Sequence, residues 1–224
     1  PFSRGLMSST LPDSHMSPQG RKPVISRDDI IAAALKLLGP NRGISTLSLR
    51  EVAREAGIAP NSIYRHFRDL DELAVALIDL AGESLRQIIV EARQRATAEH
   101  GVVQGCADAF MERLNADDRL LHILLREGKV GSPEFKHAVE RQLNFFEEEL
   151  KQDLMYLATI KNTGLYDPGL TAKAITRLVF TMGATALDMP KEMHIELSKQ
   201  IVQMVRMIIA GTQALAAFKT KSGL

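Results

Sequence analysis

Residues 48–67 read SLREVAREAGIAPNSIYRHF, and this stretch predicts two short helices joined by a tight turn. Ser48 is followed at the third helical position by Glu51, the pattern of a capping box, and helically spaced apolar residues follow. Gly57 is expected to end the first helix, and Pro60 suits the first turn of the second. Two short amphipathic helices joined through glycine form a helix-turn-helix, whose second helix can enter the major groove of DNA.

The second of these helices has an apolar and a polar face. Ile63 and Phe67 are four residues apart and are expected to face inward, while Asn, Ser, Arg and His side chains share the outer face. Arginine suits guanine edges or phosphate, asparagine suits adenine, and hydroxyl or imidazole groups suit phosphate. The alternative is that this face is merely solvated and contacts no DNA. The same alternative holds for the chain segment before residue 26, which we call the arm. We expect DNA contacts from Ser48, Arg50, Pro60, Asn61, Ser62, Tyr64, Arg65 and His66, and from Lys22 on the preceding arm.

The charge is divided unevenly along the 224 residues. The chain has 28 Lys and Arg against 27 Asp and Glu, a net charge of +1. Residues 17–70 hold nine bases and five acids, whereas residues 71–224 hold 18 bases and 21 acids. A basic front and an acidic remainder are expected when one end meets phosphates. One cysteine excludes an internal disulfide framework, and an apolar content of 45% argues against disorder.

Helical periodicity runs through nearly all segments, so we predict an all-α protein of nine helices in two domains. Residues 1–16 are interpreted as a vector-derived leader. Residues 17–70 form the predicted three-helix DNA-binding domain, and residues 71–224 a helical ligand-binding and dimerisation bundle. The helix starts are predicted at or beside Ser26, Ser48, Pro60, Asp69, Gly101, Asp117, Ser132, Asp167 and Pro190.

Targeting and catalytic signals are missing from the sequence. It contains no signal-peptide core and no long uninterrupted apolar segment, which favours the cytoplasm. A single E-x-x-H, from Glu134 to His137, lacks the second copy that a di-iron bundle needs. No nucleophile elbow, phosphate loop or dinucleotide fingerprint occurs, so we expect no cofactor, no metal and no enzymatic activity. A helical enzyme is the alternative of another class.

The region from Arg27 to Leu77 resembles the DNA-binding domain of the tetracycline-repressor (TetR) family of bacterial transcriptional regulators. The resemblance rests on LSLREVAREAGI at residues 47–58, IYRHF at residues 63–67 and DEL at residues 71–73. The family often has Ser or Thr where this chain has Ala59, and Lys where it has Leu70. The resemblance implies a ligand-responsive repressor that binds a palindromic operator as a homodimer.

Further segments resemble regulators of unsaturated fatty-acid synthesis in that family. They are AGIAP at residues 56–60, YRHFRD at 64–69, LLRE at 124–127 and GATALD at 183–188. The resemblance implies control of fatty-acid desaturation or synthesis genes and a long-chain acyl-CoA or acyl-thioester effector. A drug-like or aromatic inducer is the alternative within the same fold.

The expected ligand and dimer regions lie in the second domain. Phenylalanine and methionine line adaptable apolar pockets, although ordinary core packing is the alternative for each of them. Candidates for contact with an anionic ligand head are Arg119, Arg126 and Lys129, although solvated surface bases are the alternative. Close helix pairing between two copies is expected from the small residues Gly183, Ala184, Ala186, Ala210 and Gly211. We expect an acyl chain to be bordered by Phe110, Leu114, Leu124, Phe146, Leu150 and Phe180.

Overall fold

The computed structural model describes residues 25–39, 42–94, 101–116, 118–130 and 132–222. Within these residues the chain has eight α-helices, and its sole strand-like feature is a bridge between Gly39 and Arg42. With the 3₁₀ helix η2 they make the nine helices expected, and η1 and η3 are further short 3₁₀ turns. The all-α fold class is confirmed. The predicted leader and Lys22 lie outside the described residues.

A small group of elements, which we call the head, precedes the longest part of the fold. Each start has a local cause: Ser26 Oγ accepts from Asp29 N at 3.1 Å, and Ser48 Oγ accepts from Glu51 N at 3.3 Å. Gly57 has a φ of 71°, which suits glycine and closes the preceding helix. The head comprises α1 (Arg27–Leu37), η1 (Ile44–Thr46), α2 (Leu49–Glu55) and η2 (Pro60–Arg65).

One local expectation for the head needs correction and another is refined. Ser48 caps α2, but the Glu51 carboxylate accepts from Arg42 Nη2 at 2.7 Å, so the reciprocal half of the capping box is not formed. The short helix expected after Pro60 is present and is refined to a six-residue 3₁₀ helix, with hydrogen bonds of the i to i+3 type such as Ser62 N to the Ala59 carbonyl.

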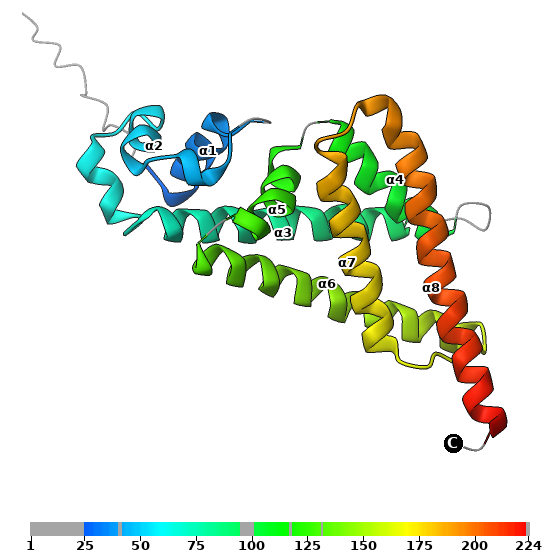
Figure 1. The fold of residues 1–224 in the computed structure, drawn as a ribbon. Coiled ribbons are helices and arrows are strands. Elements are labelled where there is room, and N and C mark those ends of the chain that lie inside the picture. The colour runs from blue at the N-terminus through cyan, green and yellow to red at the C-terminus, as the bar shows by residue number, and fades with distance from the viewer. Residues whose placement is uncertain (1–24, 40–41, 95–100, 117, 131, 223–224) are drawn as a thin grey trace, which may run out of the picture.

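Helix α3 (Leu70–Gln94) joins the head to the rest of the chain. Asp69 Oδ1 accepts from Glu72 N at 2.9 Å, which confirms the predicted start. Its 25 residues span about 37 Å at 1.5 Å per residue. The predicted extension to residue 98 lies outside the described residues. Figure 1 shows α3 crossing the molecule, with the head at its N-terminal end.

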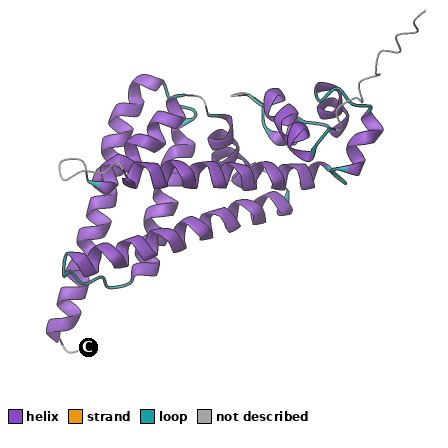
Figure 2. Cartoon of the chain, turned by 180° about the vertical axis from the view of Figure 1, so that it is seen from behind, coloured by secondary structure: helices purple, strands orange, loops and turns teal. Residues whose placement is uncertain are grey.

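The remaining helices, which we call the body, pack around α3. Ser132 and Asp167 cap their helices as predicted; residue 117 is not described, and Asp118 Oδ1 instead accepts from Leu120 N and Leu121 N. Helices α4, α5 and α6 contact α3, while α7 packs on α5, α6 and α8, and α8 packs on α4 and α7 (Figures 1 and 2). The body comprises α4 (Val102–Asn115), α5 (Arg119–Val130), α6 (Pro133–Ile160), α7 (Pro168–Ala186), η3 (Lys191–Met193) and α8 (His194–Ser222).

One apolar core extends from the head through α3 into the body. Ile30, Ile63 and Phe67 are fully buried in the head, and Leu73 and Leu77 continue this core along α3. Arg119 Nη1 on α5 also donates to the Leu35 carbonyl of α1 at 2.7 Å. The head therefore rests on both α3 and α5. The predicted boundary between the DNA-binding domain and the second domain, at residues 70 and 71, stays a prediction.

The stretch from Lys191 to Thr220 is long and apolar enough, by length and composition, to cross a membrane. No segment of this kind was expected from the sequence. A single helix that passes this test is weak evidence for a membrane span, because core helices pass it too. Its inner side packs on α4 and α7, with Leu197, Ile201 and Val205 buried. Its outer side carries exposed apolar side chains.

Candidate DNA-binding face and ligand cavity

The α2–turn–η2 unit has a polar outer face and an apolar inner face that packs in the core. Ile63 and Phe67 are fully buried, as the sequence predicted, whereas the Tyr64 side chain is 52% exposed. The predicted contact residues divide by burial. Ser48, Arg50, Asn61, Tyr64 and Arg65 are exposed, and Pro60, Ser62 and His66 are partly buried.

The charges of the head are partly neutralised within it. Glu51 pairs with Arg42 at 2.7 Å and Asp69 with Arg68 at 2.8 Å. Arg50 and Arg65, in contrast, form no ion pair within the part of the chain that the structure describes. These two guanidinium groups are therefore available to phosphate oxygens or base edges.

Arg27, which the sequence did not single out, braces the end of η2 against α3. Its Nη1 donates to the His66 carbonyl at 2.6 Å and to Glu72 Oε1 at 3.0 Å, and its guanidinium carbon lies 4.0 Å from the Phe67 ring centroid. Glu72 also accepts from Arg68 N at 2.9 Å, and these bonds lower the pKa of Glu72, the Arg68 bond most strongly. Arg27 therefore links the end of η2 to the start of α3, and these contacts span about 40 residues of sequence, so no local pattern predicts them.

A buried polar network holds the middle of α3 against α6. Gln142 is 3% exposed; its Oε1 accepts from Arg86 Nη1 at 2.7 Å and its Nε2 donates to Asp79 Oδ1 at 2.7 Å. A Cβ atom on Gly82 would lie 2.0 Å from Gln142 Oε1, so the two helices approach as closely as glycine allows. The register between α3 and α6 is therefore specified by side-chain shape and by hydrogen bonds.

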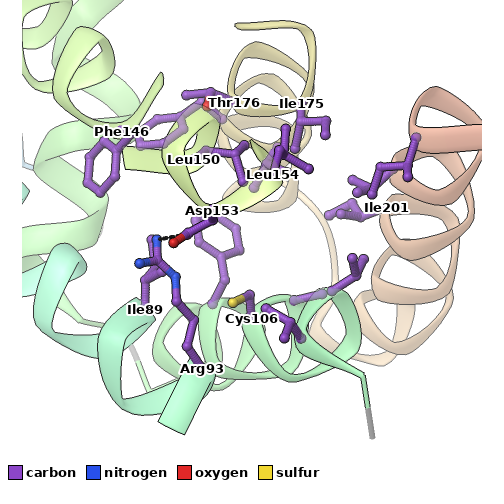
Figure 3. A pocket seen from close by; sticks show the side chains of 18 of the residues that line it. Ile89, Arg93, Cys106, Phe146, Leu150, Asp153, Leu154, Ile175, Thr176 and Ile201 are labelled. Carbon is purple, nitrogen blue, oxygen red and sulfur yellow. Dashed lines mark ion pairs between the residues drawn. The ribbon is translucent and has the colours of Figure 1, made fainter. Parts of the chain in front are cut away.

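Beyond this network the body encloses an apolar cavity of about 180 Å³. Phe146 and Phe180 stand in its wall with ring centroids 5.5 Å apart. Figure 3 shows lining side chains converging on this space from the surrounding helices. The apolar wall is formed by Leu85, Ile89, Val102, Val103, Ala107, Phe110, Phe146, Leu150, Leu154, Leu157, Ile175, Val179, Phe180, Ile201, Val205 and Ile209.

Four of the six predicted ligand residues, Phe110, Phe146, Leu150 and Phe180, line this cavity. Leu114 and Leu124 do not, which corrects the expectation that they border it: they are 2% and 1% exposed and belong to the solid core. Both have the apolar periodicity of a wall residue, and periodicity cannot distinguish a void from a neighbouring side chain.

An ion pair interrupts the apolar wall, and the sequence did not predict it. Arg93 Nη2 on α3 lies 2.8 Å from Asp153 Oδ2 on α6, and both residues line the cavity (Figure 3). Burial raises the pKa of Asp153, and Arg93 opposes that shift. Burial likewise raises the pKa of the Cys106 thiol in the same wall, so this cysteine is a weak nucleophile.

The other polar candidates lie elsewhere. Arg119 bonds to the head, as described above, and Arg126 Nη2 lies 3.6 Å from Asp188 Oδ1; neither lines the cavity. The Lys129 side chain lies outside the described residues. Among the described residues no cluster of three or more His, Cys, Asp or Glu side chains could hold a metal ion, including around His137.

The small residues expected at a dimer contact have two different environments. Gly183 is buried against Phe110, where an added Cβ would lie 2.5 Å from Phe110 Cζ, and Ala186 is fully buried. They permit close packing inside the body, which corrects the interpretation that they face a second copy. Ala210 and Gly211 are exposed on α8.

A capped helix-turn-helix head, joined by one long helix to a helical body with an apolar cavity, defines the class of two-domain DNA-binding regulators. Known proteins agree with this assignment. A sequence model described as bacterial regulatory proteins, tetR family, matches residues 30–77. The chain is 38% identical to an uncharacterized HTH-type transcriptional regulator of Haemophilus influenzae over 186 residues, which are 83% of this chain and 89% of the relative.

Two solved structures share the fold at low sequence identity. FadR of Thermus thermophilus, a TetR-family repressor in complex with lauroyl-CoA, has a TM-score of 0.63 and 17% identity and matches 82% of this chain and 93% of that one. SmeT in complex with triclosan has a TM-score of 0.63 and 20% identity and matches 83% of this chain and 90% of that one. The chain belongs to the tetR family of bacterial regulatory proteins. It is a transcriptional regulator and not an enzyme.

Proposed function

We propose that the protein is a homodimeric repressor of fatty-acid desaturation or synthesis genes that responds to a long-chain acyl-CoA or acyl thioester. The observation that carries the proposal is the course of α3, whose C-terminal part lines the cavity and whose N-terminal end carries the head. An effector that shifts α3 would change the position of the head. Operator affinity would then depend on the ligand.

The DNA-binding part of the proposal rests on placed contacts more than on total charge. The head region carries four more bases than acids, so the nonspecific phosphate attraction of one copy is small. A dimer would present two heads to half-sites about 34–36 Å apart, which predicts a palindromic operator. Such a regulator acts in the cytoplasm, where its DNA lies.

For the dimer we propose the outer faces of α7 and α8 as the contact. Leu170 on α7 and Ile195 and Met207 on α8 are exposed, with Met207 at 71%. Apolar surface of this extent on two neighbouring helices favours burial against a second copy. Light scattering at micromolar concentration should give twice the 24.7 kDa of one chain. A single-chain mass would contradict the dimer.

The effector class is supported by the nearly all-apolar wall of the cavity and by the acyl-CoA carried by the Thermus thermophilus relative. An operator is first selected from a pool of random duplexes. Thermal unfolding and operator affinity are then measured with dodecanoyl-CoA or oleoyl-CoA, and with free CoA as the control. A raised melting temperature with changed operator affinity in either direction supports the proposal. Unchanged values for both acyl-CoAs contradict it.

A drug-like or aromatic inducer is the second candidate, since SmeT, of the same fold, was solved with triclosan. The neighbouring rings of Phe146 and Phe180, tilted by 45° to each other, would suit an aromatic ligand. Triclosan is therefore tested in the same assays. A response to triclosan without a response to the acyl-CoAs would favour this candidate over the acyl effector.

The DNA-binding face is tested with Arg65→Ala and Tyr64→Phe. A lost base or phosphate contact costs about 1–3 kcal/mol, so Arg65→Ala should weaken operator binding about fivefold or more, and Tyr64→Phe by less. Lys161→Ala, which removes an exposed positive charge from the end of α6, is the matched control. Unfolding should be unchanged in all three variants. Operator binding at wild-type strength would remove Arg65 and Tyr64 as contacts.

A further inference from the structure

The cavity wall has charged side chains at one place. Of the described residues that line it, Arg93 and Asp153 alone are charged, and they form an ion pair at 2.8 Å between α3 and α6. Their side chains are 26% and 33% exposed, so the pair stands where the cavity approaches solvent. Figure 3 shows the pair near Ile89 and Cys106, with the apolar side chains of Phe146, Leu150 and Leu154 on the same helix as Asp153. A ligand with an apolar chain and one polar group would place that group here.

The pair offers hydrogen-bond donors without offering a net charge. A guanidinium has five N–H donors in a fixed plane, and the Asp153 carboxylate can accept at most two of them in a paired geometry. The opposite charges of Arg93 and Asp153 cancel at this point of the wall. A neutral carbonyl oxygen can accept from the guanidinium while the ion pair stays intact.

A carboxylate meets a different situation at the same place. It must approach the Asp153 carboxylate within a partly desolvated site, where like charges repel strongly. The environment of Asp153 already disfavours its charged form, because burial raises its pKa. A second negative charge would add to that cost, or would have to separate Asp153 from Arg93.

We propose that the Arg93–Asp153 pair is a selectivity site that admits aliphatic chains ending in a neutral ester or thioester carbonyl and disfavours the corresponding free carboxylates. The carbonyl oxygen accepts a hydrogen bond from Arg93, and Asp153 repels the carboxylate. The inference rests on the proposed acyl effector and assigns it a chemical form. It also assigns a binding role to two residues on α3 and α6, which are neighbouring helices in the cavity wall.

The test compares two probes of equal chain length, dodecanoyl-N-acetylcysteamine thioester and dodecanoate, in direct binding titrations near neutral pH. The wild-type protein should bind the thioester at least tenfold more tightly than the carboxylate. Asp153→Asn should raise dodecanoate affinity about tenfold with little change for the thioester. Arg93→Met should lower thioester affinity about tenfold, because the apolar stem remains while the donors are lost.

Glu148→Gln is the matched control for Asp153→Asn. It removes one negative charge from the same helix, but Glu148 pairs with Lys151 outside the cavity. Its ratio of thioester to carboxylate affinity should equal that of the wild type. Thermal unfolding of every variant establishes that it is folded. The wild-type ratio tests the inference even if a variant does not fold.

The outcomes separate this inference from the proposed function. Equal binding of both probes by the wild type, or tighter binding of dodecanoate, overturns the selectivity site and leaves an acyl effector in place. An unchanged ratio in Asp153→Asn overturns the role of the pair. If the thioester, dodecanoate and dodecanoyl-CoA all fail to bind, the proposed effector class falls and the inference falls with it.

Discussion

The two halves of α3 differ in how they meet the rest of the protein. Near the head, Leu73, Leu77 and Ile78 are fully buried, and Gly82 presses against Gln142 with no space left between α3 and α6. Farther along, Leu85, Ile89 and Arg93 face a cavity. The part of α3 from Leu70 to Gly82, which we call the closed half, is thus closely packed where it supports the head. The part from Leu85 to Gln94, which we call the open half, is loosely packed beside the cavity. Under the proposed function, a displacement of the open half by an effector would be carried to the head, because the closed half holds α3 as one rigid helix.

The largest expected effect comes from breaking the closed half with Gly82→Ala. The new methyl group cannot fit 2.0 Å from Gln142 Oε1, so Gln142 must leave its bonds to Arg86 and Asp79. The free energy of unfolding should fall by about 2–4 kcal/mol, because overpacking and unpaired buried polar atoms outweigh the gain in helix propensity from glycine to alanine. Urea unfolding measures the change. The control is Gly105→Ala, whose Cβ would lie 3.5 Å from its nearest neighbour; equal stability of both variants would contradict the close packing.

A smaller effect is expected where α3 meets the head, from Arg27→Met. The variant loses the donors to the His66 carbonyl and Glu72, so η2 is held less firmly. The free energy of operator binding should become less favourable by about 1–2 kcal/mol. Hydrogen bonds of charged groups are strong, and the partial exposure of this site reduces their contribution. Arg42→Met is the control, since Arg42 has a similar ion pair with Glu51 but contacts neither His66 nor Phe67. Equal loss in both variants would indicate a simple charge effect.

The cavity beside the open half is tested with Gly183→Ala on α7. The added methyl group meets the outer edge of the Phe110 ring at 2.5 Å, but this ring borders the cavity and can move into it. We expect a stability loss of about 1 kcal/mol or less, below that of Gly82→Ala, together with weaker binding of dodecanoyl-CoA. Thermal unfolding and binding titration measure the two effects. A large stability loss with unchanged ligand affinity would show that the cavity does not accommodate the ring.

The smallest effect concerns pH and the junction of α6 with α7. Arg177 donates two bonds of 2.8 Å to Glu140 and one of 2.7 Å to Glu147, and the bonds to Glu140 hold the pKa of that carboxyl below its ordinary value of 4.5. A lowered pKa in the folded state contributes stability above the ordinary value, and this contribution disappears as the pH falls through the folded value.

Glu140→Gln should therefore lower the urea midpoint slightly at neutral pH and flatten its decline below about pH 4.5. Glu196→Gln is the control, because its pair with Lys199 is 4.0 Å long and exposed on α8. Parallel pH profiles for Glu140→Gln and the wild type would contradict the assignment.

Much of the fold was predictable because its signals are local. Ser26, Asp69, Ser132 and Asp167 begin helices where the sequence places them, and Ile63 and Phe67 are buried as their spacing predicts. The predictions failed where a residue had a partner that is distant in the sequence. The Glu51 side chain bonds to Arg42 instead of completing a capping box. Leu114 and Leu124 pack in the solid core, although the sequence predicted that they border the cavity.

The sequence alone determined the helix-turn-helix head, the all-α class and the family, because caps, turns and apolar spacing act over a few residues. Only the tertiary structure decided which residues meet across helices. Arg27 bonds to the His66 carbonyl, Gln142 packs against Gly82, and Arg93 pairs with Asp153 in the wall of a cavity. The reason is physical: these contacts depend on the register and separation of helices that are distant in the chain, and short-range periodicity contains no information about either.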